Sequence, residues 1–134
     1  MLFRSAKGGR NDRWSGTSDT GNLGEYAWID DTALPPGERS GSRVHPVGTK
    51  KPNGYGIYDM SGNLFEWVAD RYGGDYYKKS PRENPTGPEE GDLRIVRGGS
   101  WDSHLIEVRT AVRFARSPNY KNYMTGFRCA KDAE

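Results

Sequence analysis

Apolar and polar residues alternate in several short stretches of this chain, and a period of two residues predicts short β-strands. Leu64–Val68 is the clearest stretch, with Phe65 and Trp67 on one face and the other three residues on the opposite face. Val108–Ala115 alternates in the same way and favours a second strand, with a short helical turn around Ile106–Arg109 as the alternative.

Two further strands are predicted next to glycines. Leu93–Trp101 runs into the turn Gly98-Gly99-Ser100, and Gly126–Ala130 closes the chain. Turn-forming residues are concentrated in long segments that predict surface loops, namely residues 5–22, 30–42 and 72–92. We find no strong amphipathic helix and no internal repeat, so the pattern predicts a single turn-rich domain over residues 1–134.

Aromatic residues must form much of the core of such a domain. The apolar set makes up only 33% of the 134 residues, and the 18 glycines add no side chain to a core. The chain has four Trp, eight Tyr and four Phe, and each aromatic side chain buries roughly 150–250 Å² when it is enclosed. Trp14 is the one large residue of the 5–22 loop, which we therefore predict to be ordered.

The charge pattern argues against two classes of partner. Twenty basic and 18 acidic residues are well mixed and give a net charge of +2, whereas nucleic-acid binding requires a one-sided basic face. No apolar run approaches the roughly 20 residues of a membrane span, and the first residues lack the apolar core of a signal peptide. We expect no nucleic-acid partner, no membrane association and, by default, a cytoplasmic location.

Cys129 is the only cysteine in the chain. An intrachain disulfide is therefore impossible, as is a cluster of thiolates around zinc, copper or iron–sulfur within one chain. We predict that Cys129 is a small buried residue on a terminal strand, and a reactive or cross-chain thiol is the alternative.

The stretch Pro52–Trp67 carries the clearest candidate chemistry. Asp59 and Glu66 flank the turn Met60–Asn63, whose backbone carbonyls are available as ligands. Calcium takes six to eight oxygens from carboxylates, carbonyls and water, so this stretch is a candidate ion site. Spacing alone favours the plainer alternative, a turn in which the aspartate caps the backbone and the glutamate is solvated.

Polar and aromatic residues near the C-terminal end predict a recognition surface. Ser100–His104 contains a hydroxyl, a carboxylate and an imidazole, but members of a catalytic triad meet through the fold and not along the chain. Tyr, Ser and Asn are adaptable contact residues, so we predict a ligand-binding face with a plain polar loop as the alternative. Its predicted residues are Ser100, Trp101, Asp102, Ser103, His104, Arg116, Tyr120, Asn122 and Tyr123.

Arginines recur beside the apolar strand residues, at positions 94, 97, 109, 113, 116 and 128. Ion pairs with Glu66, Asp70 or Glu107 are one role for them. Hydrogen bonds from guanidinium groups to backbone carbonyls are a common way to brace a fold rich in loops. We predict bracing as their main role, with anion binding as the alternative.

Four segments in order resemble one known family. They are Pro46-Val-Gly, the whole of Pro52–Trp67, Arg97-Gly-Gly-Ser-Trp and Gly126-Phe-Arg-Cys, and they resemble the formylglycine-generating enzyme, or sulfatase-modifying factor, family. The resemblance implies a C-type-lectin-like α+β fold with low regular secondary structure. It also implies that this chain corresponds to the C-terminal half of the domain, truncated at the N-terminus, so that a cysteine partner for Cys129 would lie in the absent half.

The resemblance also bears on metals. Catalytic members hold copper with two cysteines, at the positions of Ser103 and Val108 in this chain. Neither residue is a thiolate ligand for Cu(I), so no copper, no catalytic residue and no formylglycine generation are expected, although Ser100 matches the active-site serine. The family's calcium ligands correspond to Asp59, Gly62, Leu64 and Glu66, which raises the expectation of a structural Ca²⁺ site.

Three functions are consistent with these features. The first is a non-catalytic, calcium-supported module that binds a ligand or partner. The second is an enzyme remnant or subunit that needs another chain to supply the missing half. The third is a truncated product stabilised by self-association, in which a homo-oligomer covers the face that the missing half would cover. The sequence identifies no ligand.

Overall fold

The computed structural model describes residues 2–83 and 85–130, and most of this chain runs in loops and turns. The regular elements are all short: α1 (Leu2–Lys7), the 3-10 helix η1 (Thr20–Glu25), β1 (Phe65–Arg71), α2 (Tyr76–Lys79), β2 (Arg94–Arg97), β3 (Phe114–Arg116) and β4 (Thr125–Gly126). This is the α+β fold of low regular secondary structure that the resemblance implies. No helix in the described ranges is long and apolar enough to cross a bilayer.

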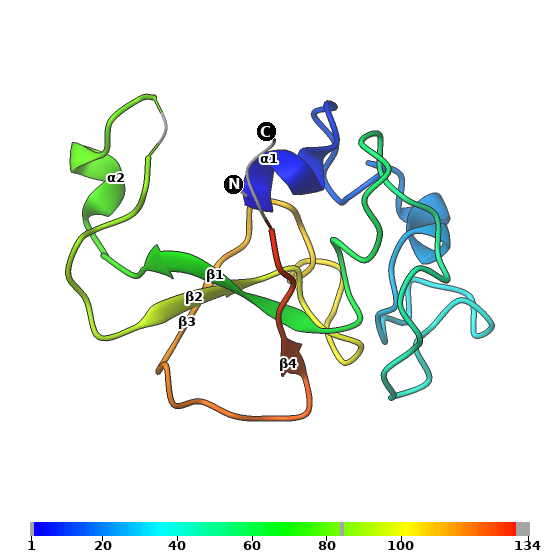
Figure 1. The fold of residues 1–134 in the computed structure, drawn as a ribbon. Coiled ribbons are helices and arrows are strands. Elements are labelled where there is room, and N and C mark those ends of the chain that lie inside the picture. Colours follow the sequence, from blue (N-terminus) through cyan, green and yellow to red (C-terminus); the bar gives the residue numbers. More distant parts are fainter. Residues whose placement is uncertain (1, 84, 131–134) are drawn as a thin grey trace.

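One mixed sheet organises the strands in the order β3-β2-β1-β4. β2 is antiparallel to both β1 and β3, whereas β4 lies parallel to β1. Figure 1 shows α2 beyond one end of the sheet, and α1 and the loops around η1 toward the other end. Trp67, Val96 and Phe114 are direct partners across three strands and therefore share one face, while Glu66 and Arg97 share the other.

The predicted strands at Leu64–Val68 and Leu93–Trp101 both exist, with different lengths. β1 begins one residue later and continues to Arg71. β2 ends at Arg97, because Gly98 and Gly99 adopt φ angles of +90° and +76°, which an extended strand does not allow.

The strand predicted over Val108–Ala115 is wrong for most of its length. Only its last two residues belong to β3, while Leu105–Val108 forms a turn, as in the helical-turn alternative. Val108 and Thr110 are nevertheless buried and Arg109 and Ala111 exposed. The alternation therefore reflects burial of every second residue in an irregular segment, since Val108 packs into the core.

The terminal strand and the burial of Cys129 also differ from prediction. β4 contains only Thr125 and Gly126, and Cys129 is exposed. Arg128 turns toward Glu66, while Phe127 lies on the outside with 76% of its surface exposed. The free thiol is therefore accessible, as in the alternative for this residue.

The main core lies among the loops and not under the sheet. Its buried members are Trp14, Leu23, Ala27, Ile29, Leu34 and Val108. The predicted anchor, Trp14, is completely buried, and its indole Nε1 donates a hydrogen bond of 2.7 Å to the Leu105 carbonyl. A large aromatic side chain whose polar atom also finds a partner holds two distant loops together.

Three buried polar side chains of the Pro52–Trp67 stretch connect further loops. Ser61 Oγ donates to the Val108 carbonyl and accepts from the Ser15 amide. Asn63 pairs with His45 through both ends of its side chain, donating to the carbonyl and accepting from the amide. Asn53 Nδ2 donates to the Ser5 carbonyl at 2.6 Å.

Asn53 makes the largest number of these bonds. Its Nδ2 also reaches Ser15 Oγ at 3.2 Å, and its Oδ1 accepts from the amides of Tyr55 and Ile57. Because Asn53 is only 7% exposed, water does not replace a lost partner at this position. Each buried group left without a partner costs about 1–3 kcal/mol.

We therefore predict that Asn53→Ala lowers the free energy of unfolding by about 3 kcal/mol, measured by urea denaturation. Asn119→Ala is the matched control, since Asn119 is exposed and only its backbone amide is hydrogen-bonded. Equal stability of the two variants would show that Asn53 is not an anchor.

Candidate functional site

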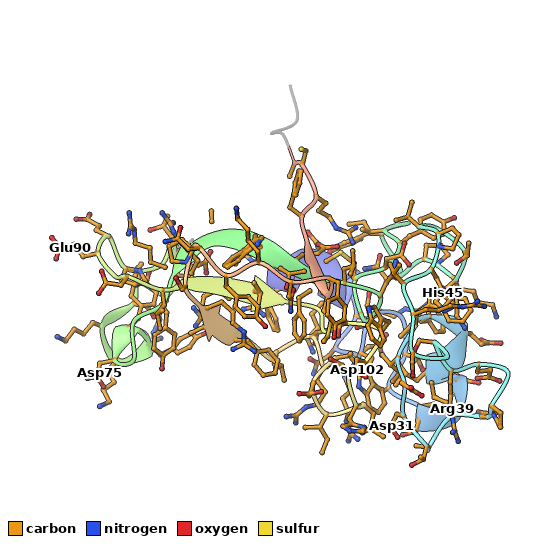
Figure 2. All side chains as sticks on the ribbon, turned by 90° about the horizontal axis from the view of Figure 1, so that it is seen from below. Asp31, Arg39, His45, Asp75, Glu90 and Asp102 are labelled. Carbon is orange, nitrogen blue, oxygen red and sulfur yellow. The ribbon has the colours of Figure 1, made fainter. Side chains whose placement is uncertain are left out.

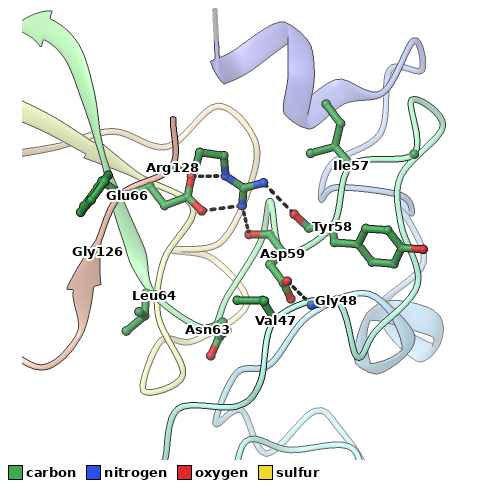
Figure 3. A pocket seen from close by; sticks show the side chains of 12 residues that line it. Val47, Gly48, Ile57, Tyr58, Asp59, Asn63, Leu64, Glu66, Gly126 and Arg128 are labelled. Carbon is green, nitrogen blue, oxygen red and sulfur yellow. Dashed lines mark hydrogen bonds and ion pairs between the residues drawn. The ribbon is translucent and has the colours of Figure 1, made fainter. Parts of the chain in front are cut away.

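Asp59 and Glu66 line the same cavity, which has a volume of about 530 Å³ (Figure 3). Its wall also includes Asn63 from the turn, the following Leu64, Gly126 of β4, and Phe127 and Arg128 after β4. Asp59 and Asn63 have φ angles of +56° and +64°, a conformation that Asn and Asp tolerate better than other side chains. The Asp and Asn at these positions thus allow the tight turn that brings the two carboxylates to one cavity.

Each carboxylate already has a partner in this cavity. Asp59 Oδ2 accepts a hydrogen bond of 2.7 Å from the Gly48 amide. Glu66 forms a two-point ion pair with Arg128, whose Nε lies 2.7 Å from Oε2 while its Nη2 contacts Oε1. The Asp59 bond matches the capping role in the plain-turn alternative, whereas Glu66 is paired and not solvated.

Arg128 also donates to backbone carbonyls, from Nη1 to Tyr58 at 2.9 Å and from Nη2 to Asp59 at 3.0 Å. One guanidinium therefore fastens the end of the chain to the turn, as the predicted bracing role requires. Four other arginines of the predicted set donate to carbonyls as well, namely Arg94, Arg97, Arg109 and Arg116.

The donors of the cavity are compatible with a calcium ion that relies mainly on backbone oxygens. Within the described ranges, no three His, Cys, Asp or Glu side chains gather as a metal cluster, so the two carboxylates would act with carbonyls and water. Asp59 Oδ1 forms no hydrogen bond with the described residues, and carboxylate oxygens carry lone pairs beyond those used by Arg128. A calcium ion would share Glu66 with the guanidinium.

Ser103 and Val108, the positions that the resemblance assigns to the copper cysteines, lie side by side around Gly99. A Cβ atom placed on Gly99 would come within 3.3 Å of Ser103 Oγ and 2.4 Å of a Val108 methyl group. Ser103 Oγ accepts a hydrogen bond of 3.1 Å from the Ser100 amide. The side chains of Ser100, Ser103 and Val108 are all buried. In place of two thiols, this chain therefore has the hydrogen-bonded hydroxyl of Ser103 and the methyl groups of Val108, which pack in the core.

Only some of the predicted ligand-binding residues form a common surface. Trp101 and Tyr123 stack with their ring centroids 6.0 Å apart, and the Arg116 guanidinium lies 5.5 Å from the Tyr120 ring. Asn122 donates to the Tyr120 hydroxyl. Asn122 and Tyr123 are consecutive and connect the two groups along the chain, and we call the five residues the aromatic face. Tyr123 is 74% exposed and is therefore accessible to a partner.

The other four predicted residues lie elsewhere. Ser100 and Ser103 are buried at 1% and 3% exposure, so they support the face from beneath. Asp102 is exposed, and Figure 2 shows it on the same side of the molecule as Asp31. His104 Nδ1 lies 3.6 Å from Asp31 Oδ2, whereas Ser100 Oγ is within hydrogen-bond distance of Ser103 Oγ and Met124 Sδ; among the described residues no hydrogen bond joins Ser100 to His104.

Asp31 is a site that the sequence reading missed. Its side chain is 10% exposed and accepts hydrogen bonds of 2.8 Å from the amides of Ala33 and Leu105. Burial alone raises the pKa of Asp31, but the two amides and His104 outweigh burial, and the pKa lies below its ordinary value. The hydrogen bond to Ala33 could have been predicted, because an Asp side chain commonly accepts from the amide two residues later in a turn. The hydrogen bond from Leu105 could not, because only the fold brings that residue to Asp31.

One family of known proteins matches nearly the whole of this chain. The family model described as "Sulfatase-modifying factor enzyme 1-like domain" matches residues 3–133. The chain belongs to this sulfatase-modifying factor family. The resemblance carried by the four sequence segments is thereby confirmed.

Proteins with quite different names are similar to this chain. It is 47% identical over 83 residues to serine/threonine-protein kinase pkn1 of Chlamydia pneumoniae, covering 60% of this chain and 13% of the kinase. It is 40% identical over 92 residues to the formylglycine-generating enzyme of Streptomyces coelicolor, covering 66% and 29%. The inactive C-alpha-formylglycine-generating enzyme 2 of Mus musculus is 32% identical, with 75% and 31% covered.

A solved structure confirms the fold of the family. Treponema denticola variable protein 1 superposes with a TM-score of 0.82 at 37% identity, covering 94% of this chain and 43% of that protein. The chain therefore spans less than half of this neighbour and less than a third of each relative named above. The activities of those longer proteins do not transfer to this chain by similarity alone.

We predict that Asp31→Asn removes an acid-dependent part of the stability. Because the folded pKa of Asp31 lies below the unfolded value of 3.8, its contribution is present above that value and is lost as the pH falls through the folded pKa. At pH 7 the variant should be less stable by about 2 kcal/mol, the scale of hydrogen bonds to a charged group. The difference from the native chain should shrink toward pH 2.

Urea denaturation between pH 2 and pH 7 measures this difference. Asp75→Asn is the matched control, because Asp75 is exposed and pairs only with the neighbouring Lys78. A stability gap for Asp31→Asn that stays constant over this range would contradict the assigned role.

Proposed function

We propose that this chain is a non-catalytic binding module of the sulfatase-modifying factor family. The observation that carries the proposal is the packing of Ser103 and Val108 around Gly99, at the positions of the copper thiolates in catalytic members. Cu(I) selects soft thiolate ligands, and the only cysteine of the chain, Cys129, follows β4 and is exposed. The site has the packing of a core and not the ligands of the catalytic metal.

The proposed binding surface is the aromatic face of Trp101, Arg116, Tyr120, Asn122 and Tyr123. Its rings are held by stacking and by a cation–π contact before any partner arrives. Preformed aromatic side chains give a large contact area at a low cost in conformational entropy. Tyr123 is the most exposed of the five and is the natural centre of contact.

Calcium supports this module in our proposal. Asp59 and Glu66 would supply the charge, with the carbonyls of Gly62 and Leu64 as further ligands. We call the segment Asp59–Glu66 the ion loop. The bound ion would stiffen this loop, because the four residues span the turn and the first two residues of β1. Its role is structural, and it touches no residue of the aromatic face.

We predict that calcium raises the melting temperature and that a chelator lowers it, since a ligand that binds only the folded state stabilises that state. Asp59→Gly removes the carboxylate and keeps a residue suited to φ of +56°, so its melting temperature should no longer respond to calcium. Asp75→Ala should respond as the native chain does. An unchanged native melting temperature in chelator, with no calcium in elemental analysis, would remove the ion from the proposal.

The binding proposal can be tested with a displayed library of random peptides. Peptides selected on the native chain should lose about tenfold or more in affinity for Tyr123→Ala, because exposed Tyr anchors commonly contribute on this scale. Tyr72→Ala is the matched control, as Tyr72 is also exposed but follows β1 at the other end of the sheet. Selected peptides that bind Tyr123→Ala equally well would refute this face.

The similarity to the Streptomyces enzyme favours a second candidate, a subunit that gains formylglycine-generating activity when another chain completes it. An activity assay on the native chain distinguishes the binding module from the enzyme subunit. Incubation with copper and a cysteine-containing sulfatase peptide should yield no aldehyde under the binding-module proposal. Turnover to aldehyde would favour the enzyme and contradict the assignment of Ser103 and Val108.

A further inference from the structure

A second hollow, larger than the cavity beside Asp59 and Glu66, lies away from both the ion loop and the aromatic face. It has a volume of about 960 Å³ and is bounded by α1, by α2 with the loop after it, by β1 and by the 111–113 segment. In the view of Figure 1, α1 and α2 both lie above the sheet. We call this hollow the arginine groove, after the residues that distinguish it.

Its lining is strongly biased in charge. Four arginines, Arg4, Arg82, Arg97 and Arg113, line the groove with a single carboxylate, that of Asp70. The whole chain has nearly balanced charges, so this concentration is local. Like charges gathered around a concave, partly desolvated wall produce a positive potential that favours anions.

Two of these arginines lie without a carboxylate partner, and one of them has a buried nitrogen without a hydrogen-bond partner among the described residues. Arg113 Nη1 donates to the Tyr77 hydroxyl at 2.7 Å, but its buried Nε has no hydrogen-bond partner among the described residues. Arg97 Nη1 donates to the carbonyls of Thr110 and Val112 at 3.2 and 3.3 Å. Neither guanidinium is in an ion pair within the described part of the chain.

The electrostatics point in the same direction. Burial, and next the positive charge of Arg113, lower the pKa of Arg97 below its ordinary value, while Tyr77 and Asp70 act in the opposite sense. Two neighbouring guanidiniums that form no ion pair with a carboxylate within the described residues repel each other and are poorly hydrated, and the charge of Asp70 does not offset this for Arg97. An oxyanion between them would relieve both effects.

Aromatic rings complete the groove. The Arg113 guanidinium lies 5.1 Å from the Tyr77 ring and that of Arg97 lies 6.0 Å from the Phe3 ring. Tyr55 and Tyr76 line the same space. Small-molecule sites commonly combine apolar, aromatic walls with a few convergent polar groups.

We propose that the arginine groove binds a small organic oxyanion. Its carboxylate, phosphate or sulfate group accepts hydrogen bonds from Arg97 and Arg113, whose planar guanidiniums match such groups. Its apolar or aromatic body lies against Phe3, Tyr76 and Tyr77. Anion binding thus adds to the bracing role of Arg97, which already uses Nη1 for carbonyls.

Calorimetric titration of the full chain tests the proposal with four probes: inorganic phosphate, phenyl phosphate, benzoate and neutral benzamide. Phenyl phosphate and benzoate should bind, phosphate more weakly than phenyl phosphate, and benzamide not measurably. Tighter binding of phenyl phosphate than of inorganic phosphate shows that the groove also binds the aromatic ring of the ligand, and not the anion alone. Equal binding of benzamide and benzoate, or no binding of any anion, would overturn the proposal.

Variants locate the bound anion. Arg113→Gln should weaken phenyl phosphate binding about tenfold or more, as expected for loss of a hydrogen bond to a charged group. Arg109→Gln is the matched control, because Arg109 is exposed, lies outside the groove and donates only to the Ile106 carbonyl. Unchanged affinity in Arg113→Gln would overturn the assignment.

Tyr77→Phe provides a second variant if Arg113→Gln fails to fold. It removes the hydroxyl that competes for Arg113 Nη1 and preserves the ring, so phenyl phosphate should bind at least as tightly as in the native chain. A tenfold loss of affinity in Tyr77→Phe would show that the ligand depends on the hydroxyl and not on the guanidinium, and would overturn the proposal.

Discussion

Hydrogen bonds from buried side chains to loop backbones are the interaction on which this fold depends. A chain with so little helix and strand leaves many backbone groups without regular partners, and buried groups of that kind must be satisfied. Asn53, Ser61 and Asn63 supply partners from within one short stretch. Guanidinium groups do the same at the edges of the sheet, where Arg128 reaches two successive carbonyls. The polar interior replaces the ladders that a more regular fold would use.

Buried apolar residues lie both in the sheet and among the loops. Ile95 and Val96 are buried in the central strand, but the main cluster gathers around Trp14, outside the sheet. Val108 belongs to that cluster and also touches Gly99. The segment that carries copper ligands in catalytic members is therefore, in this chain, part of the hydrophobic core.

Sequence patterns predicted the parts of the fold that are locally determined. Alternation located β1, because it depends on neighbours in the chain. The strand predicted over Leu93–Trp101 was located as well but extended too far, because β2 ends at Arg97, before the paired glycines. Alternation failed at Val108, where burial of every second residue comes from contact with Trp14 and Gly99 and not from strand pairing. Cys129 was misplaced for a similar reason, since a two-residue β4 leaves no strand to bury it. Asp59 and Glu66 lie close together in the sequence and line one cavity, whereas the arginine groove joins segments from α1 to Arg113 and no single stretch indicates it.

The contact between Asn53 and Ser5 has a consequence for how the N-terminal boundary of this domain is chosen. Ser5 lies in α1, whose first turns form one wall of the arginine groove. The hydrogen bond from Asn53 Nδ2 to the Ser5 carbonyl joins α1 to a loop 48 residues later in the chain. An expression boundary set after Gly9 would remove Phe3, Arg4 and Ser5 from the lining of the groove. It would also leave the Asn53 amide without its shortest hydrogen bond.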